Sequence, residues 1–447
     1  MCDLGGLLLC GGVRLAGAFV HNHPGIALCA VPSGVIIMAS STIEPTRAGG
    51  APGCPFAGSR TASRISGPRR TPVPSAARTL TAVPDLPADA LRLARVVSRQ
   101  VRESGKHVLP PSLLHAMVLL RGRPDRFVVA FLDCLLDKHD GRFHNRTYLA
   151  LGLLELILAD PRGVPDRERL SALLMADVIR HETAVAATPP RADDDRPDAR
   201  TLGARLAHAR RFVAECGVPE GAALPVPPDG VVGEWFAMTA QPVSVVHDEY
   251  FFLRALQCHE LVFTGLAENV VGATAALREG DVPSAREQVE RAVAAFAKAA
   301  LLFRVVATMR AAAFHRFREF TQGASAIQSE AYKRFEIACG RPSTERLRSD
   351  AFGNVAAVRA EALAGADDLS SAYLAARPQP QLDGPEWERF DAAVVELERR
   401  HQRWKTTHFR LAARMLGDAA GSGYTAGVPY LRQCLENRLF WRLPLAA

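Results

Sequence analysis

A helix-like stretch near the C-terminus carries the residues of this chain best suited to chemistry. It reads Arg403-Trp-Lys-Thr-Thr-His408 and runs into a glycine-rich turn at 421–427. A neutral imidazole such as that of His408 is a suitable ligand for iron. Helical spacing alone does not decide whether it binds a metal. His401 lies seven residues earlier on the same face, and a histidine on an apolar helix face is commonly a hydrogen-bonded core residue.

A second segment combines an arginine with aromatic and hydroxyl side chains. It reads Phe314-His-Arg-Phe-Arg318-Glu-Phe, then Ala324-Ser325-Ala-Ile-Gln-Ser, then Tyr332-Lys-Arg-Phe-Glu336. The planar guanidinium of Arg318 can bind a carboxylate through two parallel hydrogen bonds. A surface salt bridge with the neighbouring Glu319 is the alternative role for this arginine.

A third segment lies earlier, at Asp248-Glu-Tyr-Phe-Phe252 and Gln257-Cys-His259-Glu-Leu-Val-Phe263. The three segments together resemble the tryptophan 2,3-dioxygenases, a family of haem enzymes that open the indole ring. The resemblance covers roughly residues 248–440. The middle segment is the most specific, because it keeps the family's order, spacing and residue types over about twenty positions.

The resemblance implies a cofactor, haem b, and the residues that surround it. It makes His408 the axial ligand of the haem iron, with Trp404 and Ser325 beside the haem. His401 is expected to be structural.

The resemblance also implies a substrate site. It implies that Arg318 binds the substrate carboxylate and that Phe314 lines the substrate pocket. It also implies that the Ser422 hydroxyl contacts the substrate's ammonium and carboxylate groups. The implied substrate is an aromatic amino acid or an indole, with O2 or peroxide as the oxidant. Family members are typically oligomeric, so a homo-oligomer is expected.

The sequence departs from the family at two positions that bear on the reaction. Leu256 stands where the family has its distal histidine, and His259 on a nearby face of the same helix is the candidate substitute. Tyr424 replaces a glycine of the turn that approaches the substrate, which indicates a changed substrate. A weaker likeness joins Asn145–Leu151 to the family segment that donates a tyrosine to a neighbouring subunit, here Tyr148.

These departures leave several functions open. By family precedent the chain cleaves the 2,3 bond of L-tryptophan to give N-formylkynurenine. A haem-dependent hydroxylase of tyrosine or an indole is the nearest alternative. A non-catalytic haem-binding or scaffold protein, or a helical interaction protein without haem, belongs to a different class.

Composition argues against several other classes of protein. Of the net charge of +7, five units belong to residues 1–80, and no basic stripe with interleaved aromatics follows, so nucleic-acid binding is not expected. Nine scattered cysteines without a Cys-x-x-Cys motif fit a reducing cytoplasm. Arg14, His21 and Pro24 interrupt the apolar N-terminus, and no other stretch reaches the roughly 20 apolar residues of a membrane span.

The elements that must position these residues are expected to be helices, because alanine, leucine and arginine abound and no strand alternation appears. Long helices are predicted from Asp248 to Leu277, from a capping box at Ser284-Ala-Arg-Glu287, and from Pro385 to about Gly417. Shorter helices are predicted at 88–100, 110–120, 126–137, 147–158, 167–181 and 202–216.

The sequence therefore predicts an all-α protein in three parts. Residues 1–85, rich in Gly, Pro, Ser and Arg, are expected to be a disordered tail, with an alternative start at Met38. Residues 86–235 form an accessory helical layer, and 236–447 form a haem-binding helical bundle of the tryptophan dioxygenase type. The role of the accessory layer is left open.

Overall fold

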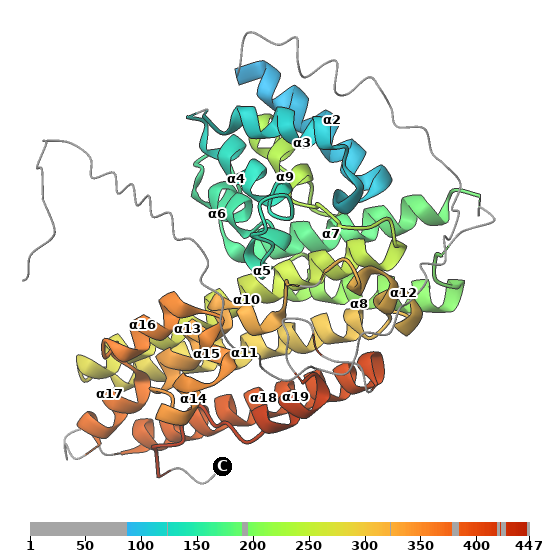
Figure 1. Cartoon of the computed structure of the whole chain (residues 1–447). Coiled ribbons are helices and arrows are strands. Elements are labelled where there is room, and N and C mark those ends of the chain that lie inside the picture. The colour runs from blue at the N-terminus through green and yellow to red at the C-terminus, as the bar shows by residue number, and fades with distance from the viewer. Residues whose placement is uncertain are drawn as a thin grey trace, which may run out of the picture. The chain divides into compact units, whose positions relative to one another are not determined.

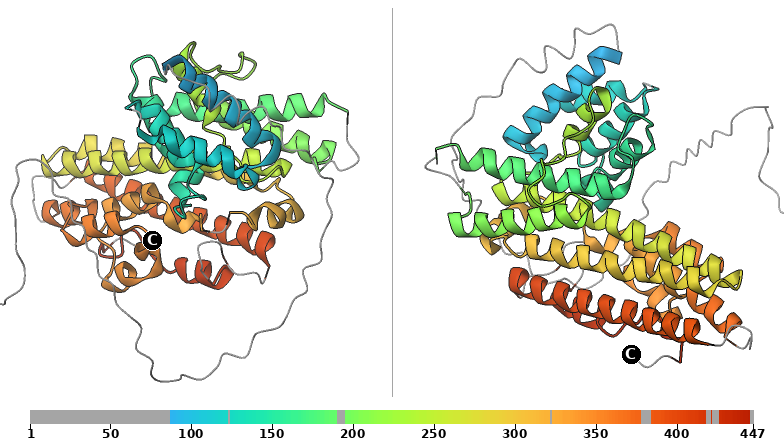
Figure 2. Two further views of the ribbon diagram at one scale, coloured as in Figure 1. Left: turned by 45° about the horizontal axis from the view of Figure 1, so that its top comes forward. Right: turned by 180° about the vertical axis from the view of Figure 1, so that it is seen from behind.

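Three long helices frame the computed structural model of this chain. They are α10 (His247–Arg278), α11 (Val282–Val306) and α18 (Pro385–Leu416). Helix α11 packs against α10 along one side and against α18 along the other, as Figures 1 and 2 show in separate views. The prediction of three long helices in an all-α fold is confirmed, since no described residue lies in a β-strand.

The ends of these helices follow from local chemistry. Pro385 occupies the first turn of α18, where its missing N–H costs nothing, and Gly417 ends the helix with φ 55°. The predicted capping box at Ser284 is wrong. Asp281 is the N-cap of α11, and its carboxylate accepts a hydrogen bond from the backbone N–H of Ser284 at 3.0 Å. The helix therefore begins three residues earlier than predicted, and Ser284 lies in its first turn.

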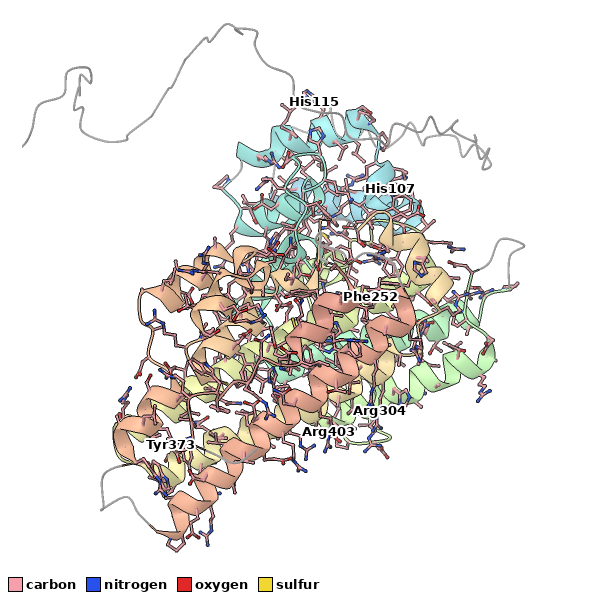
Figure 3. All side chains as sticks on the ribbon, turned by 60° about the horizontal axis from the view of Figure 1, so that its bottom comes forward. His107, His115, Phe252, Arg304, Tyr373 and Arg403 are labelled. Carbon is pink, nitrogen blue, oxygen red and sulfur yellow. The ribbon has the colours of Figure 1, made fainter. Side chains whose placement is uncertain are left out.

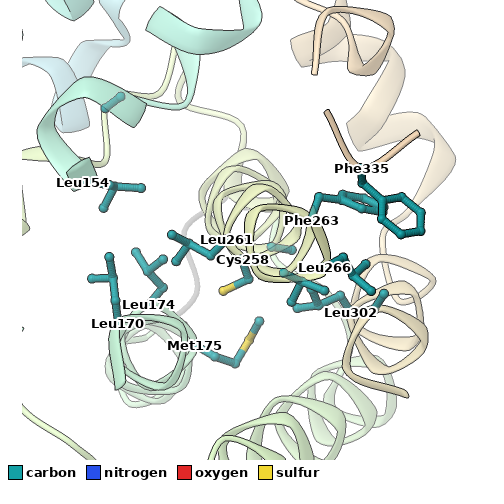
Figure 4. Close-up of a cluster of buried hydrophobic side chains, with 14 of the residues drawn as sticks. Leu154, Leu170, Leu174, Met175, Cys258, Leu261, Phe263, Leu266, Leu302 and Phe335 are labelled. Atoms are coloured by element: carbon teal, nitrogen blue, oxygen red, sulfur yellow. The ribbon is translucent and has the colours of Figure 1, made fainter. Parts of the chain in front are cut away.

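Helix α10 lies at the centre of the hydrophobic core and is buried on most sides. Figure 4 shows Cys258 and Leu261 on the side of α10 that faces Leu174 and Met175 of α7. Phe263 lies on another side, toward Phe335 of α13. A helix that is apolar on so many sides requires neighbours on all of them.

An N-terminal helical layer supplies some of those neighbours, as predicted. Helix α7 packs against α10, and α8 packs against both α7 and α11. The layer consists of α2 (Pro87–Ser104), η1 (Lys106–Val108), α3 (Pro111–Val118), η2 (Leu119–Gly122), α4 (Arg126–Leu135), α5 (Asn145–Tyr148), α6 (Leu151–Ala159), α7 (Arg167–Ala186), α8 (Ala199–Glu215) and α9 (Val231–Met238).

The single helix predicted for residues 147–158 is wrong. The chain forms the short helix α5 and then α6, with Ala150 between them at φ 48°. A left-handed alanine is costly, so tertiary contacts must hold this bend. Two such contacts are hydrogen bonds of α5: the backbone N–H of Asn145 donates to Gln328 Oε1 at 2.9 Å, and the Tyr148 hydroxyl donates to Glu249 Oε1 at 3.3 Å.

Short helices complete the C-terminal part. Helix α13 packs against α10, and α12 packs against α10 and α18. They are α12 (Ala311–Arg318), η3 (Ala326–Gln328), α13 (Glu330–Cys339), α14 (Thr344–Arg348), α15 (Asp350–Gly353), α16 (Ala356–Leu363), α17 (Leu369–Ala376) and α19 (Val428–Cys434).

The structure describes residues 87–122, 124–189, 195–321, 323–377, 384–417, 421 and 426–444, and the predicted tail 1–85 lies outside them. The described residues all belong to one compact unit, and the predicted boundary at 235/236 falls inside it. Across the described helices, none alone is long and apolar enough to cross a membrane. Only α11 and α12 taken together pass that test, and they are bent by 93° where they meet.

Candidate functional site

A cavity of about 270 Å³ opens among α10, α11, α12, α13 and α18. Seven of the nine predicted site residues line it, although they come from four separate stretches of the chain: Leu256, His259, Phe314, Arg318, Ser325, Trp404 and His408. The other two, Ser422 and Tyr424, lie outside the described residues. The fold therefore brings together the residues that the sequence singled out, from two long helices, the short helix α12 and the turn before η3.

His408 lies on the cavity face of α18 beside two aromatic rings. Its ring stacks on Phe303 at a centroid distance of 5.7 Å and lies 5.6 Å from Trp404. Burial lowers the pKa of His408 to about 4, so its imidazole is neutral near pH 7. Neither ring nitrogen has a hydrogen-bond partner among the described residues. A neutral, unbonded imidazole in a cavity wall is free to ligate a metal.

His401, expected to be structural, occupies a different environment one helical repeat earlier. It is 2 % exposed, and its Nε2 accepts a hydrogen bond from the Tyr332 hydroxyl at 2.9 Å. Its other nitrogen lies 3.7 Å from a carboxylate oxygen of Glu398. Both sides of this ring are occupied by the protein, which distinguishes it from His408.

The aromatic wall on this side was not predicted as part of the site. Phe303 of α11 contacts the rings of His259, Trp404 and His408 at 5.1, 5.3 and 5.7 Å. Phe263 meets the Trp404 ring edge-on at 5.1 Å. The sequence showed Phe303 only as part of the apolar face of α11, because periodicity does not say which core residues border a cavity.

Leu256 and His259 lie on adjacent positions of the α10 surface that borders the cavity. His259 is 7 % exposed, and its Nδ1 lies 3.0 Å from the carbonyl oxygen of Ala255 on its own helix. Its Nε2 is buried without a hydrogen-bond partner. Burial lowers the pKa of His259 to about 4. The ring is therefore neutral near pH 7, and its N–H is directed at its own helix.

Arg318 and Phe314 reach the cavity from α12. The guanidinium of Arg318 lies 6.0 Å from the Phe314 ring, and that ring packs against Phe252 at 6.1 Å and Phe317 at 5.5 Å. Figure 3 shows Phe252 in the interior between the N-terminal layer and the C-terminal helices. This end of the cavity joins a cation to a group of aromatic rings, which suits an aromatic molecule that carries a carboxylate.

Ser325 lies at the N-cap position of η3. Its backbone N–H donates to Gln328 Oε1 at 3.2 Å, and the Gln328 amide donates to the carbonyl oxygen of Gly323 at 2.9 Å. Gly323 has φ 99°, a conformation that favours glycine. These bonds hold a tight turn whose serine borders the cavity.

The N-terminal layer contributes directly to the cavity wall through Asn145, Tyr148 and Leu149. Tyr148 belongs to the segment with a weak likeness to the one that donates a tyrosine between subunits in the family. Here it is 3 % exposed and borders the cavity of its own chain. The accessory layer is thus part of the site.

Buried cations border the cavity near Tyr430 and Cys434. Lys333 Nζ and Arg346 Nε lie 2.9 and 2.7 Å from carboxylate oxygens of Glu336, and Lys405 Nζ donates to the carbonyl oxygen of Cys434 at 2.9 Å. Burial lowers the pKa of Lys333 and of Lys405 to about 8. Lys333, Arg346 and Lys405 lie near two carboxylates, Glu336 and Glu398, which leaves one cation in excess, so an anionic group at this end would be stabilised.

The donor set fits a haem. A haem needs a neutral imidazole for its iron, apolar and aromatic walls for its ring, and cations for its two carboxylate groups. The cavity offers these as His408, as Phe303 with Trp404, and as the lysines and arginines in its wall.

Known proteins resemble the region that forms the cavity. Residues 236–364 match the family model described as tryptophan 2,3-dioxygenase. A tryptophan 2,3-dioxygenase of Bradyrhizobium sp. is 26% identical over 241 residues, 45% of this chain and 85% of the relative. The tryptophan 2,3-dioxygenase of Ruegeria sp. is 27% identical over 230 residues, which cover 44% of this chain and 82% of the relative. The one of Burkholderia mallei is 24% identical over 235 residues, which cover 44% of this chain and 76% of the relative. The cavity-forming part of this chain is therefore similar, at low identity, to the tryptophan 2,3-dioxygenases.

Proposed function

We propose that this chain is a haem-dependent oxygenase that acts on an aromatic amino acid or a related indole. The observation that carries the proposal is the convergence of seven predicted site residues on one cavity, with a neutral, unbonded imidazole in its wall. The family match and the named relatives support the same activity class.

His408 would ligate the iron of haem b, and Phe303 and Trp404 would pack beside it. The bound haem would supply the activation of O2 or peroxide. The protein's own contribution is to hold the substrate in place and to keep water out. The lining is mostly apolar, which favours both roles.

Arg318 would hold the substrate carboxylate, with the aromatic part against Phe314 and Phe252. A guanidinium pairs with a carboxylate through two parallel hydrogen bonds, which fixes orientation as well as position. An aromatic ring gains from apolar burial and from edge-to-face contacts with phenylalanine rings.

A hydroxylase of tyrosine or an indole is the second candidate, and Leu256 favours it. This side chain borders the cavity at the position where the resemblance puts the family's distal histidine. A leucine can neither accept nor donate a proton, so a reaction that depends on a base at that position would need another group.

Absorption spectra test the proposal. The whole chain, produced with added haem, is expected to give the ferric, ferrous and ferrous–CO spectra of a histidine-ligated haem. His408→Ala should lose that spectrum. Arg403→Ala, at an exposed position of the same helix seen in Figure 3, should keep it.

The cofactor assignment would be overturned by a wild-type protein that folds and stays colourless, or by a His408→Ala protein with an unchanged spectrum. Titration of the haem-loaded protein with tryptophan, tyrosine and indole should then shift its spectrum for the preferred substrate. A chain that binds haem and shows no shift with any of them would instead be a haem-binding protein without turnover.

A further inference from the structure

One carboxyl group in the cavity wall has no role in the function described so far. Glu260 of α10 borders the cavity and is only 8 % exposed. Its Oε1 accepts a hydrogen bond from the Asn145 side-chain amide at 3.2 Å, and its Oε2 accepts one from the Ser329 hydroxyl at 3.0 Å. Both donors are neutral, and no cation of the described chain forms a salt bridge with this carboxyl group.

Glu336, in the same cavity's surroundings, shows how the chain treats a structural carboxylate. It is equally buried at 7 %, but Lys333 and Arg346 pair with it, and its pKa lies well below the usual range. Glu260 lacks such partners, and burial raises its pKa to about 7, although Ser329 and Asn145 lower it in part. A group of this kind gains and loses a proton near neutral pH.

The charged groups around Glu260 do not remove the upward shift of its pKa. Glu330 raises the pKa of Glu260 slightly and Arg146 lowers it. Arg146 is itself paired with Glu155, through a bond of 2.7 Å. His259, the next residue before it in the chain, is neutral near pH 7 because burial lowers its pKa to about 4.

Glu260 lies close to Leu256, the position where the resemblance puts the family's distal histidine. It follows Leu256 by four residues, so the two side chains lie on one face of α10 about 6 Å apart along its axis. The sequence makes His259 only a candidate substitute for the distal histidine. Its N–H is directed at Ala255, and an imidazole of such low pKa is a weak base. Glu260 is the better match to a proton transfer near pH 7.

We propose that Glu260 is the proton-exchanging residue of the cavity. This inference rests on the proposed function. The ionised carboxylate takes the proton from the indole N–H or the phenol O–H of the substrate, and the electron pair of that bond stays on the substrate. The protonated carboxyl then returns the proton to the product or to water, which restores the carboxylate.

Asn145 is the positioning residue for this carboxyl group. Its backbone N–H donates to Gln328 and its side-chain amide donates to Glu260, so it fixes the carboxyl between α5 and η3. The accessory layer thereby acquires a role in the reaction. An amide that donates to a carboxylate favours its ionised form. Asn145→Ala should therefore move the ionisation of Glu260 to higher pH, which a merely structural role would not do.

Infrared difference spectra between the wild type and Glu260→Gln test the proton affinity without any cofactor. Glutamine keeps the shape, and its carbonyl oxygen can still accept from Asn145, while its NH2 group would donate to the Ser329 hydroxyl. The wild type should show a protonated carboxyl band that is present at about pH 6 and lost by about pH 8, given the pKa of about 7. No such band at about pH 6 would mean that Glu260 is always ionised, and would overturn the inference whether or not the protein binds haem.

Kinetics on the haem-loaded protein test the role itself. The wild-type kcat/KM should rise with pH through about 7, and Glu260→Gln should lose that step together with roughly 10²-fold in kcat. Glu330→Gln is a charge-neutralising change near the same carboxyl group but outside the cavity lining. It should keep both the pH-dependent step in kcat/KM and the wild-type kcat. An active Glu260→Gln enzyme with the wild-type pH profile would contradict the role of Glu260 and leave the proposed function intact.

Discussion

Arg318 is the residue to which the proposed function assigns the substrate carboxylate. It reaches the cavity from the end of α12, where Phe314 and Phe252 line the same region. Hydrogen bonds to a charged group contribute roughly 1.5–3 kcal/mol, or about ten- to a hundredfold in affinity. The two parallel bonds of a guanidinium also fix the orientation of the bound carboxylate.

We therefore expect Arg318→Met to weaken binding of the preferred aromatic amino acid by about ten- to a hundredfold. Affinity for the corresponding amine without a carboxylate should change little, because that molecule never used the guanidinium. Titration of both ligands into the wild type and the variant gives the comparison. Equal losses for the two ligands would mean that Arg318 supports the pocket and does not bind the carboxylate.

Glu260 should also affect stability, in a direction that follows from its raised pKa. Between pH 4.5 and about 7 the folded protein holds this proton and the unfolded chain does not. The free energy of unfolding must therefore fall as pH rises through that range, by about 3 kcal/mol in total. Below pH 4.5 both states are protonated and the contribution is fully present.

Urea unfolding of the wild type and of Glu260→Gln at several pH values measures this effect. The stability of the variant relative to the wild type should increase between about pH 5 and about pH 8. The buried histidines, which lose protons in the folded state at lower pH, contribute equally to both proteins and cancel. A difference independent of pH would show that Glu260 titrates alike in the folded and unfolded chain.

The sequence identified His408, Arg318 and Leu256 because a motif surrounds each of them. It did not single out Glu260, although the residue lies inside the same motif. A glutamate in a helix usually faces solvent, and only the fold reveals that Asn145, 115 residues away, closes over it. Long-range partners of this kind leave no local pattern in a sequence.

At the scale of elements, a buried ion-pair network fastens α7, α8 and α10 together. Arg205 of α8 is fully buried, with its Nη1 at 2.6 Å from Glu182 and its Nη2 at 2.9 Å from Asp248. Its guanidinium also lies 3.7 Å from the Phe251 ring. This network joins the accessory layer to the start of the helix that carries Leu256 and Glu260.

Arg205→Met should cost roughly 3–5 kcal/mol, because it removes the cation that two buried carboxylates share and leaves Asp248 with only its longer contact to Arg310 at 3.4 Å. Urea unfolding should show the loss as a lower midpoint. Arg291→Met removes an arginine from an exposed pair with Glu287, and it should change stability by less than about 0.5 kcal/mol. A similar small effect for Arg205 would mean that the network contributes little to holding the layers together.

Helix positions were predicted well where local signals were strong. Pro385 and Gly417 bound α18 as expected, since both act through their own backbone. The break between α5 and α6 was missed because the bend at Ala150 is held by Gln328 and Glu249, which belong to distant elements. Propensity favours a continuous helix there, and tertiary contacts override it.

At the scale of the whole molecule, the accessory layer and the family-like region depend on each other. Asn145, Tyr148 and Leu149 border the cavity, and α7 covers the side of α10 that carries Cys258 and Leu261. The family match begins at residue 236, but the compact unit also includes the described residues that precede it, from residue 87 onward. The region that is similar in sequence to known proteins is therefore shorter than the region that packs as one unit.

A shortened chain of residues 236–447 should therefore fail to fold cooperatively. It would expose the apolar side of α10, remove Arg205 from the buried Asp248, and leave Glu260 without Asn145. Circular dichroism during urea unfolding should show a broad change without a sharp transition, and added haem should give no defined histidine-ligated spectrum. A sharp transition with haem binding equal to that of the whole chain would establish the reverse, that the accessory layer is an appendage to a self-sufficient domain.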